Sequence, residues 1–257
     1  TGRWEWATGI NHSNWVLVNA LETDTMIPRF CALLIAQTEI EDVWHVAGMA
    51  ATGSQAVRVT DQFVPDHRTL PAMQMAAGSS PGEALHPGST LATPLRAGLA
   101  LVAATPALGA AEGALDWFVE RMRQKTLAYS GGTKQGEMPS THLRIGEAIA
   151  RVRTARLIWD DAVATLEAEG PNGAEARVEV LVALRLAAAD IVRVANEAVD
   201  IMARTAGASA SYLGAPLQRH QRDLQTMRGH VMFDWDRTAI LAGKVAMGQP
   251  TTPADLL

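Results

Sequence analysis

The spacing of hydrophobic positions changes at about residue 65. Before that point, apolar residues form short alternating or continuous runs separated by turn-forming residues, a pattern typical of β-strands. The runs lie at residues 15–18, 31–35, 43–46 and 57–59. Glycine, proline and serine then interrupt residues 66–91, above all at 78–82 and 86–89, and we expect a long surface loop there.

From about Leu91 onward the content of Ala, Leu, Arg and Glu rises, and the periodicity predicts four helices, at 92–126, 139–169, 173–206 and 217–247. Pro106 should kink or restart the first helix. The pattern therefore predicts an α+β chain. It would have a small β-barrel-like domain over residues 1–68, a linker loop over 69–91 and a four-helix bundle over 92–257.

Composition narrows the possible ligands. The 257 residues are 48% hydrophobic and 19% charged, which is enough for a substantial core. A net charge of −5 without a dense Lys/Arg block disfavours nucleic-acid and anionic-membrane partners, and the apolar stretches are interrupted before the length of a membrane span. A single cysteine, Cys31, favours a reducing, cytoplasmic location and no zinc-type metal site. A small organic ligand is the partner we expect.

The first candidate motif covers residues 6–12. Here a predicted strand ends in Gly9, and a polar turn presents Thr8, Asn11 and His12 together. Such a turn can direct side chains and free backbone N–H groups at a ligand. By itself, the same pattern equally describes two turn formers beside a surface histidine.

The second candidate motif covers residues 44–54. Small residues between Gly48 and Gly53 would allow the backbone to approach a planar cofactor closely, and Thr52 and Ser54 add hydroxyl groups. Without further context, this run is also an ordinary turn between two strands.

The third candidate is a set of polar residues spaced by three and four along the last predicted helix. On one helix they would form a single stripe beside an apolar face. By periodicity alone, an exposed face with weak ion pairs of about 0.2–0.5 kcal/mol each is the simpler interpretation. The stripe consists of Arg219, Asp223, Thr226, His230, Asp234 and Arg237.

The three motifs together resemble one superfamily. Residues 6–9 resemble the Trp-Ile-Thr-Asn strand of acyl-CoA dehydrogenases, whose Thr contacts the flavin ring. Residues 48–54 are similar to the Gly-Leu-Arg-Gly-Thr-Gly-Ser segment of the flavin monooxygenase branch, with Met49, Ala50 and Ala51 replacing Leu, Arg and Gly. Residues 216–223, followed by His230, resemble the Pro-Leu-Gln-Arg, Arg-Asp and downstream His pattern of flavin-dependent aromatic hydroxylases. The chain is thus identified as a member of the two-component (group D) flavin monooxygenases, with an acyl-CoA dehydrogenase-like fold.

This resemblance implies roles for particular residues. It implies His230 as the catalytic base and His12 as a second acid/base or hydrogen-bond donor, because histidine exchanges protons near neutrality. Arg121 and Arg123 resemble the basic end of the first bundle helix and would reach a cofactor phosphate in a neighbouring subunit. Ser209 by itself is equally a helix-terminus hydroxyl. The implied flavin contacts are Trp6, Thr8, Gly9, Thr52, Ser54 and Ser209.

The resemblance also implies an activity. Reduced FMN, or FAD in its place, would deliver one oxygen atom of O₂ to an aromatic or polyketide-type small molecule. Because the sequence has no dinucleotide fingerprint, we expect a separate flavin reductase as partner, and the Ala/Leu helix faces agree with a homotetramer. The family's N-terminal helical domain has no counterpart in residues 1–257. Since residues 1–6 are typical of the middle of a strand pair, we expect further sequence before Thr1.

Three other functions stay open. An acyl-CoA dehydrogenase shares the Trp-x-Thr strand but needs a carboxylate base, whereas residues 229–232 carry His230 in place of the Tyr-Glu-Gly-Thr motif. An amino-sugar N-oxygenase would use the same oxygenating chemistry. A non-catalytic helical scaffold would keep the fold without flavin, so flavin binding separates it from the enzymes.

Overall fold

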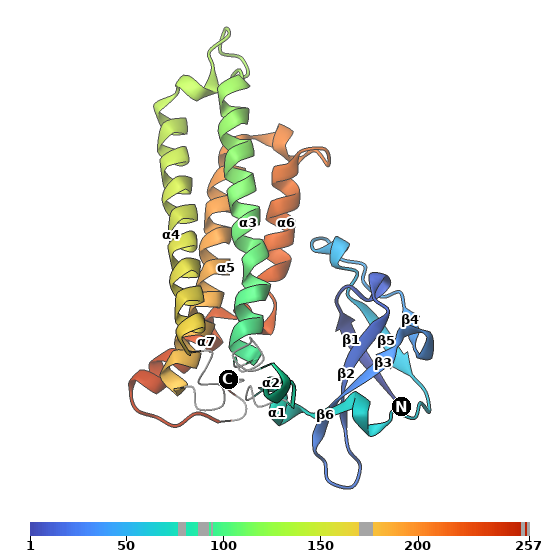
Figure 1. Cartoon of the computed structure of the whole chain (residues 1–257). Helices are drawn as coiled ribbons and strands as arrows, with labels where there is room; N and C mark the ends of the chain where they lie inside the picture. The colour runs from blue at the N-terminus through green and yellow to red at the C-terminus, as the bar shows by residue number, and fades with distance from the viewer. Residues whose placement is uncertain (77–80, 87–92, 94, 170–176, 253–254, 256–257) are drawn as a thin grey trace. The chain divides into compact units, whose positions relative to one another are not determined.

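The structure is a computed structural model that describes the chain except residues 77–80, 87–92, 94, 170–176, 253–254 and 256–257 (Figure 1). The chain divides into two compact units. The first unit consists of Thr1–Leu95 with Glu169–Ala176, and the second consists of Arg96–Ala168 with Arg177–Leu257.

The first unit contains two three-stranded antiparallel sheets. One has the order β1 (Gly2–Ala7), β5 (Gln55–Val59), β4 (Glu39–Glu41), and the other the order β2 (Trp15–Leu21), β3 (Pro28–Leu34), β6 (Thr69–Pro71). In β2, Val16 and Val18 are buried while Leu17 is exposed, the two-residue period expected of a half-buried strand. These valines belong to a small core with Ile10, Leu33, Val57 and Val59. The expected β-domain is confirmed as this pair of sheets.

Two local expectations about this unit are wrong. Residues 43–46 do not form a strand, because the Gln55 side-chain Oε1 accepts hydrogen bonds from the backbone N–H groups of Val43 (2.7 Å) and Trp44 (2.9 Å). The expected loop also begins with regular structure: β6 pairs with β3, and α1 (Ala72–Ala76) follows. A second short helix is α2 (Pro81–Leu85), whereas the glycine-rich positions 78–80 and 87–89 lie outside the described residues.

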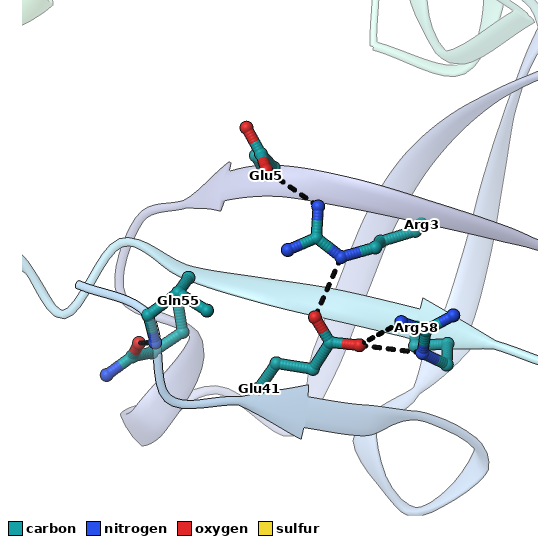
Figure 2. Close-up of polar contacts among 6 residues, drawn as sticks. Arg3, Glu5, Glu41, Gln55 and Arg58 are labelled. Carbon is teal, nitrogen blue, oxygen red and sulfur yellow. Dashed lines mark hydrogen bonds and ion pairs between the residues drawn. The ribbon is translucent and has the colours of Figure 1, made fainter.

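An ion network lies on the exposed face of the first sheet, where one carboxylate contacts two guanidinium groups (Figure 2). Glu41 on β4 accepts from Nε of Arg3 on β1 at 2.7 Å and from Nε of Arg58 on β5 at 2.6 Å. These two hydrogen bonds lower the pKa of Glu41 below its ordinary value. Exposed ion pairs contribute little individually. This network nevertheless joins the short edge strand β4 to both other strands of its sheet.

The second unit is helical. Its long elements are α3 (Leu95–Gln124), α4 (Pro139–Glu169) and α5 (Val178–Ala206), followed by the shorter α6 (Pro216–Met227) and α7 (Trp235–Ala246). Pro106 lies within α3, which runs uninterrupted past it. The buried face of α3 consists largely of alanine at spacings of three and four, which lets neighbouring helices approach closely. These alanines are Ala97, Ala100, Ala104, Ala107, Ala111 and Ala114.

The last predicted helix is broken, which corrects the expectation of one helix over 217–247. Helix α6 ends at Met227, a single 3₁₀ turn covers Val231–Phe233, and α7 begins at Trp235. The new start is capped, because Asp234 Oδ1 accepts a hydrogen bond from the backbone N–H of Arg237 at 3.1 Å. The polar stripe is therefore divided: its first three members lie on α6, and His230 precedes the 3₁₀ turn.

Helix α3 is long and apolar enough to cross a membrane, judged by length and composition, and it is the one such helix among the described residues. Its most apolar 18-residue window has a mean hydropathy of 1.4, so the expectation that every apolar stretch is interrupted is wrong here. The core helix of a globular bundle meets the same criterion. Since ten residues of α3 are buried in the bundle core, the hydropathy is weak evidence for a membrane.

Candidate active site

The first two motifs meet in a chain of three hydroxyl groups, which we call the hydroxyl relay. Thr8 Oγ1 lies 2.9 Å from Ser54 Oγ, and Ser54 Oγ lies 2.8 Å from Thr52 Oγ1. The backbone N–H of Gly9 also donates to the carbonyl of Thr52 at 2.8 Å. Ser54 is 5% exposed, whereas Thr8 is at the surface. The structure thus brings four of the six predicted flavin contacts together.

Glycine is required at two places around the relay. Gly9 has φ 76°, and no atom lies within 4 Å of the position that a Cβ would occupy, so the backbone is open to a ligand there. Gly53 has φ 51°, and its Cβ would lie 2.8 Å from Nδ2 of Asn11. Asn11 therefore packs against Gly53 and holds the two motifs in contact.

Trp6 and His12 flank the relay in sequence. Trp6 has φ 64° beside an irregularity in the β1–β5 ladder, a conformation that costs a non-glycine residue about 1–3 kcal/mol. Its side chain is 72% exposed. His12 ends a 3₁₀ turn, and its backbone N–H donates a hydrogen bond to the carbonyl oxygen of Gly9 at 3.0 Å. In the described part of the chain, no hydrogen bond joins the imidazole of His12 to the relay.

The inner end of the relay is anchored on a backbone carbonyl. Met49, in the left-handed region with φ 58°, accepts hydrogen bonds from Trp44 Nε1 at 3.0 Å and from Thr52 Oγ1 at 2.8 Å. The backbone N–H of Thr52 donates to the same oxygen at 3.1 Å. Sequence reasoning assigned no role to Trp44 or to Gln55, which ties residues 43 and 44 to β5. An indole close to a run of small residues was the available signal for Trp44.

In the second unit, two cations converge at the end of α5. Arg121 Nη2 donates to Ser209 Oγ at 2.9 Å, while Arg121 Nε is buried without a hydrogen-bond partner. Lys125 Nζ donates to the carbonyl of Ala206 at 2.6 Å, and burial, followed by the charge of Arg121, lowers the Lys125 pKa. Gly207 has φ 77°, and its Cβ would lie 2.8 Å from Lys125 Nζ. We call Arg121 and Lys125 the basic pair.

The basic pair suits an anionic group. Neither member forms an ion pair in the described ranges of the chain, so a phosphate group would be a strong partner for the two positive charges. Arg123, the other predicted phosphate contact, points elsewhere. It is 72% exposed and pairs with Glu120 at 3.3 Å. Lys125 was missed in the sequence because nothing distinguishes it there from a surface lysine.

His230 precedes the 3₁₀ turn, and its ring accepts a hydrogen bond at Nδ1 from the backbone N–H of Met232 at 3.2 Å. The ring centroid lies 5.6 Å from that of Phe233, and burial of the ring lowers the His230 pKa. Because Nδ1 accepts, the neutral imidazole carries its proton on Nε2. In this tautomer the Nε2–H of His230 would be a hydrogen-bond donor to a ligand, and the role of His230 as a base stays a prediction.

A groove of about 520 Å³ lies between α5 and the residues that surround this turn. Its lining includes Arg193, Asn196, Gly229, Phe233 and Trp235. The amide of Asn196 is buried and donates to the carbonyl of Leu224 at 3.2 Å, which holds the end of α6 against α5. The groove therefore borders the turn that carries His230. Within the described residues, no group of three or more His, Cys, Asp or Glu side chains could hold a metal ion.

Small antiparallel sheets followed by a helical unit match the acyl-CoA dehydrogenase fold. The family model for the acyl-CoA dehydrogenase C-terminal domain matches residues 101–235, and the chain belongs to this family.

Similar proteins are oxygenases. The chain is 32% identical to the oxygenase subunit HsaA of a flavin-dependent monooxygenase from Rhodococcus jostii, over 98% of this chain and 66% of that protein. It is 30% identical to the oxygenase component of an FADH₂-dependent resorcinol hydroxylase from Rhizobium, over 96% of this chain and 64% of that protein. A solved structure of XiaF from Streptomyces in complex with FADH₂ and glycerol superposes with a TM-score of 0.87 at 27% identity. The match covers 97% of this chain and 64% of XiaF. The chain spans slightly less than two thirds of each of these proteins.

Proposed function

We propose that the full-length protein is the oxygenase component of a two-component flavin-dependent monooxygenase, which uses reduced flavin and O₂ to hydroxylate an aromatic or polyketide-type small molecule. The observation that carries this proposal is the hydroxyl relay. It joins the two motifs that resemble flavin-contacting segments, at a turn where Gly9 leaves the backbone open. The oxygenase names of the relatives support it.

The residues present fit a reduced flavin. When bound, the flavin would supply the oxygen-activating chemistry. The relay and Gly9 would orient the ring. The basic pair would neutralise the phosphate of a flavin held by a neighbouring subunit, as the resemblance implies. We propose FMN as the cofactor. FAD is the alternative, because it also carries phosphate groups that the basic pair would bind.

His230 would act on the substrate oxygen. Its lowered pKa keeps the ring neutral near pH 7, and the Nε2–H then donates to a phenolate oxygen and stabilises that charge. A dehydrogenase would need a carboxylate base here. Asp234, the next carboxylate along the chain, is engaged in capping α7, which favours the oxygenase.

The proposal extends to partners and location. A separate flavin reductase would provide reduced flavin, which the names of the relatives as oxygenase components or subunits support. Exposed apolar residues on α4, namely Leu143, Ile149 and Leu157, support a homo-oligomer, which we propose to be a tetramer. With a single cysteine in 257 residues, we propose the cytoplasm.

The test is incorporation of labelled oxygen. Full-length protein would be mixed with reduced FMN and ¹⁸O₂ in the presence of a panel of phenols that includes resorcinol, and the products analysed by mass spectrometry. We expect one ¹⁸O atom in a hydroxylated product, and we expect much less of that product from His230→Gln while flavin oxidation continues. Unlabelled substrate throughout, with flavin oxidised at its protein-free rate, would contradict the proposal.

A further inference from the structure

Helix α5 holds both ends of the segment that carries His230. At the end of α6, Nδ2 of the buried Asn196 donates to the carbonyl of Leu224 at 3.2 Å. At the start of α7, the guanidinium group of Arg193 lies over the ring of Trp235, 4.7 Å from the ring centroid. Trp235 is the first residue of α7. We call Arg193 and Asn196 the α5 clamp.

The guanidinium group of Arg193 is itself held by two carboxylates of its own helix. Its Nη2 lies 2.6 Å from Asp190 Oδ1, and its Nη1 lies 2.5 Å from Glu197 Oε1. The second oxygen of Glu197 pairs with Nε of Arg151 on α4 at 3.0 Å. Exposed ion pairs are individually weak, but pairs that share one planar guanidinium group restrict its orientation. Trp235 therefore packs against a cation whose position is fixed.

The His230 ring is fixed mainly relative to its own turn. In the part of the chain that the structure describes, the ring accepts from the backbone N–H of Met232 at 3.2 Å and packs on Phe233 at 5.6 Å between centroids. Met232 and Phe233 both belong to the 3₁₀ turn that follows. The place of this turn in the bundle depends on Phe233, which reaches the core, and on the two helix ends that α5 holds.

We propose that Arg193 is a positioning residue for His230, which by holding Trp235 keeps the imidazole at one place relative to the substrate oxygen. This role rests on the proposed function, in which His230 acts on that oxygen. Trp235 follows His230 by only five positions, so a shift of the first turn of α7 also moves the histidine. A hydrogen bond weakens steeply with distance and angle. Without the clamp, flavin would still be oxidised, but less substrate would be hydroxylated.

The pKa of His230 reports this positioning without any ligand. Charged side chains line the groove beside the turn, yet burial alone lowers the His230 pKa. A change in that pKa therefore shows how closely the ring is packed. The charged residues come from α5, from the end of α6 and from the start of α7: Arg193, Glu197, Asp200, Arg228, Asp234 and Asp236.

The first measurement is this pKa in the full-length protein without flavin or substrate, by NMR of histidine labelled with ¹³C at Cε1. The signal is assigned by its loss in His230→Gln. Arg193→Gln releases Trp235, so the ring should gain contact with water and its pKa should rise towards the ordinary value of about 6.5. Trp235→Leu should cause the same rise. Trp235→Phe keeps an aromatic face for the guanidinium group and should keep the wild-type pKa.

Two controls separate positioning from general effects. Arg156 lies over Trp159 at 5.5 Å and pairs with Glu112 at 2.6 Å, so Arg156→Gln removes the same kinds of contact between α3 and α4. It should leave the His230 pKa unchanged. Arg228→Gln removes a positive charge from the groove two positions from His230 and leaves the stack intact. If loss of charge alone raised the pKa, this variant would raise it as much as Arg193→Gln.

The second measurement is the hydroxylated product formed per flavin oxidised. We expect about tenfold less in Arg193→Gln, part of the roughly hundredfold that a misplacement of about 1 Å can cost, and no change in Arg156→Gln. A wild-type yield in Arg193→Gln would overturn the positioning role. An unchanged His230 pKa in folded Arg193→Gln, or an equal rise in either control, would do the same.

If Arg193→Gln does not fold, as judged by circular dichroism, Trp235→Leu decides by the same two measurements. A wild-type pKa or a wild-type yield in that variant would contradict the role of the stack. Wild type that forms no product contradicts the proposed function itself, while the pKa measurement still decides whether Arg193 holds His230 in place.

Discussion

The hydroxyl relay and the basic pair are opposite kinds of binding group. In the relay every hydroxyl already has a partner and no charge is involved. In the basic pair, burial and then the charge of Arg121 lower the Lys125 pKa, and neither cation has a carboxylate partner in the described ranges. The first group is complete before a ligand arrives, so we expect it to position a ligand rather than attract one by charge. The second is incomplete, and we expect it to contribute most of the affinity for an anion.

Of the changes that test this contrast, neutralising Arg121 should have the largest effect, measured as weaker binding of reduced FMN. We expect Arg121→Gln to weaken the binding of reduced FMN roughly 10- to 100-fold, the loss of a charge-assisted hydrogen bond. Binding of reduced riboflavin, which lacks the phosphate, should be unchanged. The measurement is anaerobic ultrafiltration with both ligands.

Arg123→Gln is the matched control for this measurement, because Arg123 is 72% exposed and pairs with Glu120. It should leave FMN binding within about twofold of wild type, as expected for a screened surface charge. Equal losses for the two variants, or an equal loss of riboflavin binding in Arg121→Gln, would show that the basic pair is not the phosphate site.

Removing one hydrogen bond to the Met49 carbonyl, which anchors the relay, should have an intermediate effect, measured as a loss of stability. Trp44→Phe deletes the indole donor to the Met49 carbonyl, and we expect the free energy of unfolding to fall by about 1 kcal/mol, the value of one hydrogen bond. Urea denaturation followed by circular dichroism measures this change. Trp6→Phe, at a 72% exposed side chain, should leave the free energy unchanged. A larger loss in Trp6→Phe than in Trp44→Phe would contradict the anchoring role.

The smallest effect concerns pH and the turn at His230. Burial lowers the His230 pKa in the folded protein below its ordinary value of about 6.5, so folding favours the neutral ring. The resulting stability is present above pH 6.5 and is lost as the pH falls through the folded-state pKa. We therefore expect the free energy of unfolding to decrease from pH 7 to pH 5, and to decrease less in His230→Gln.

The pH range in which the His230 contribution to stability is lost differs from the range in which the Glu41 network on the first sheet loses its contribution. Glu41 also has a lowered pKa, but its ordinary value is near 4.5, so its contribution is lost only below that pH. Urea denaturation at pH 7, 6 and 5 therefore isolates the histidines. Because burial also lowers the pKa of His220, His220→Gln is measured alongside. Identical pH slopes for wild type and His230→Gln would contradict a lowered His230 pKa in the folded protein.

Much of the β-unit could be predicted from its sequence, because the relevant signals are local. The period-two burial of Val16 and Val18 follows directly from residue order. Residues 43–46 show the limit of this reasoning. They have the apolar content of a strand, but the side chain of Gln55, eleven and twelve positions away, accepts hydrogen bonds from the N–H groups of Trp44 and Val43. No local pattern encodes that contact.

In the helical unit, periodicity hid the break between α6 and α7. Spacings of three and four continue through it, so the polar stripe looks continuous in sequence. Gly229, and Asp234 placed three residues before Arg237, were the available signals for a helix end and a new N-cap. Arg121 and Arg123 lie two positions apart on one helix and therefore face different sides. The sequence does not indicate which of the two sides meets Ser209, so the different roles of these arginines could not be predicted.

The alanine face of α3 sets a practical limit on redesign of this scaffold. Ala104 and Ala111 are 0% exposed, so leucine at either position would force neighbouring helices apart, at a cost of about 1–3 kcal/mol. Leu99 and Val102, on the same helix, are 54% and 69% exposed, so we expect polar replacements there to change stability little. A mutagenesis library aimed at broader substrate scope should therefore leave the methyl-lined face of α3 unchanged and diversify the loops.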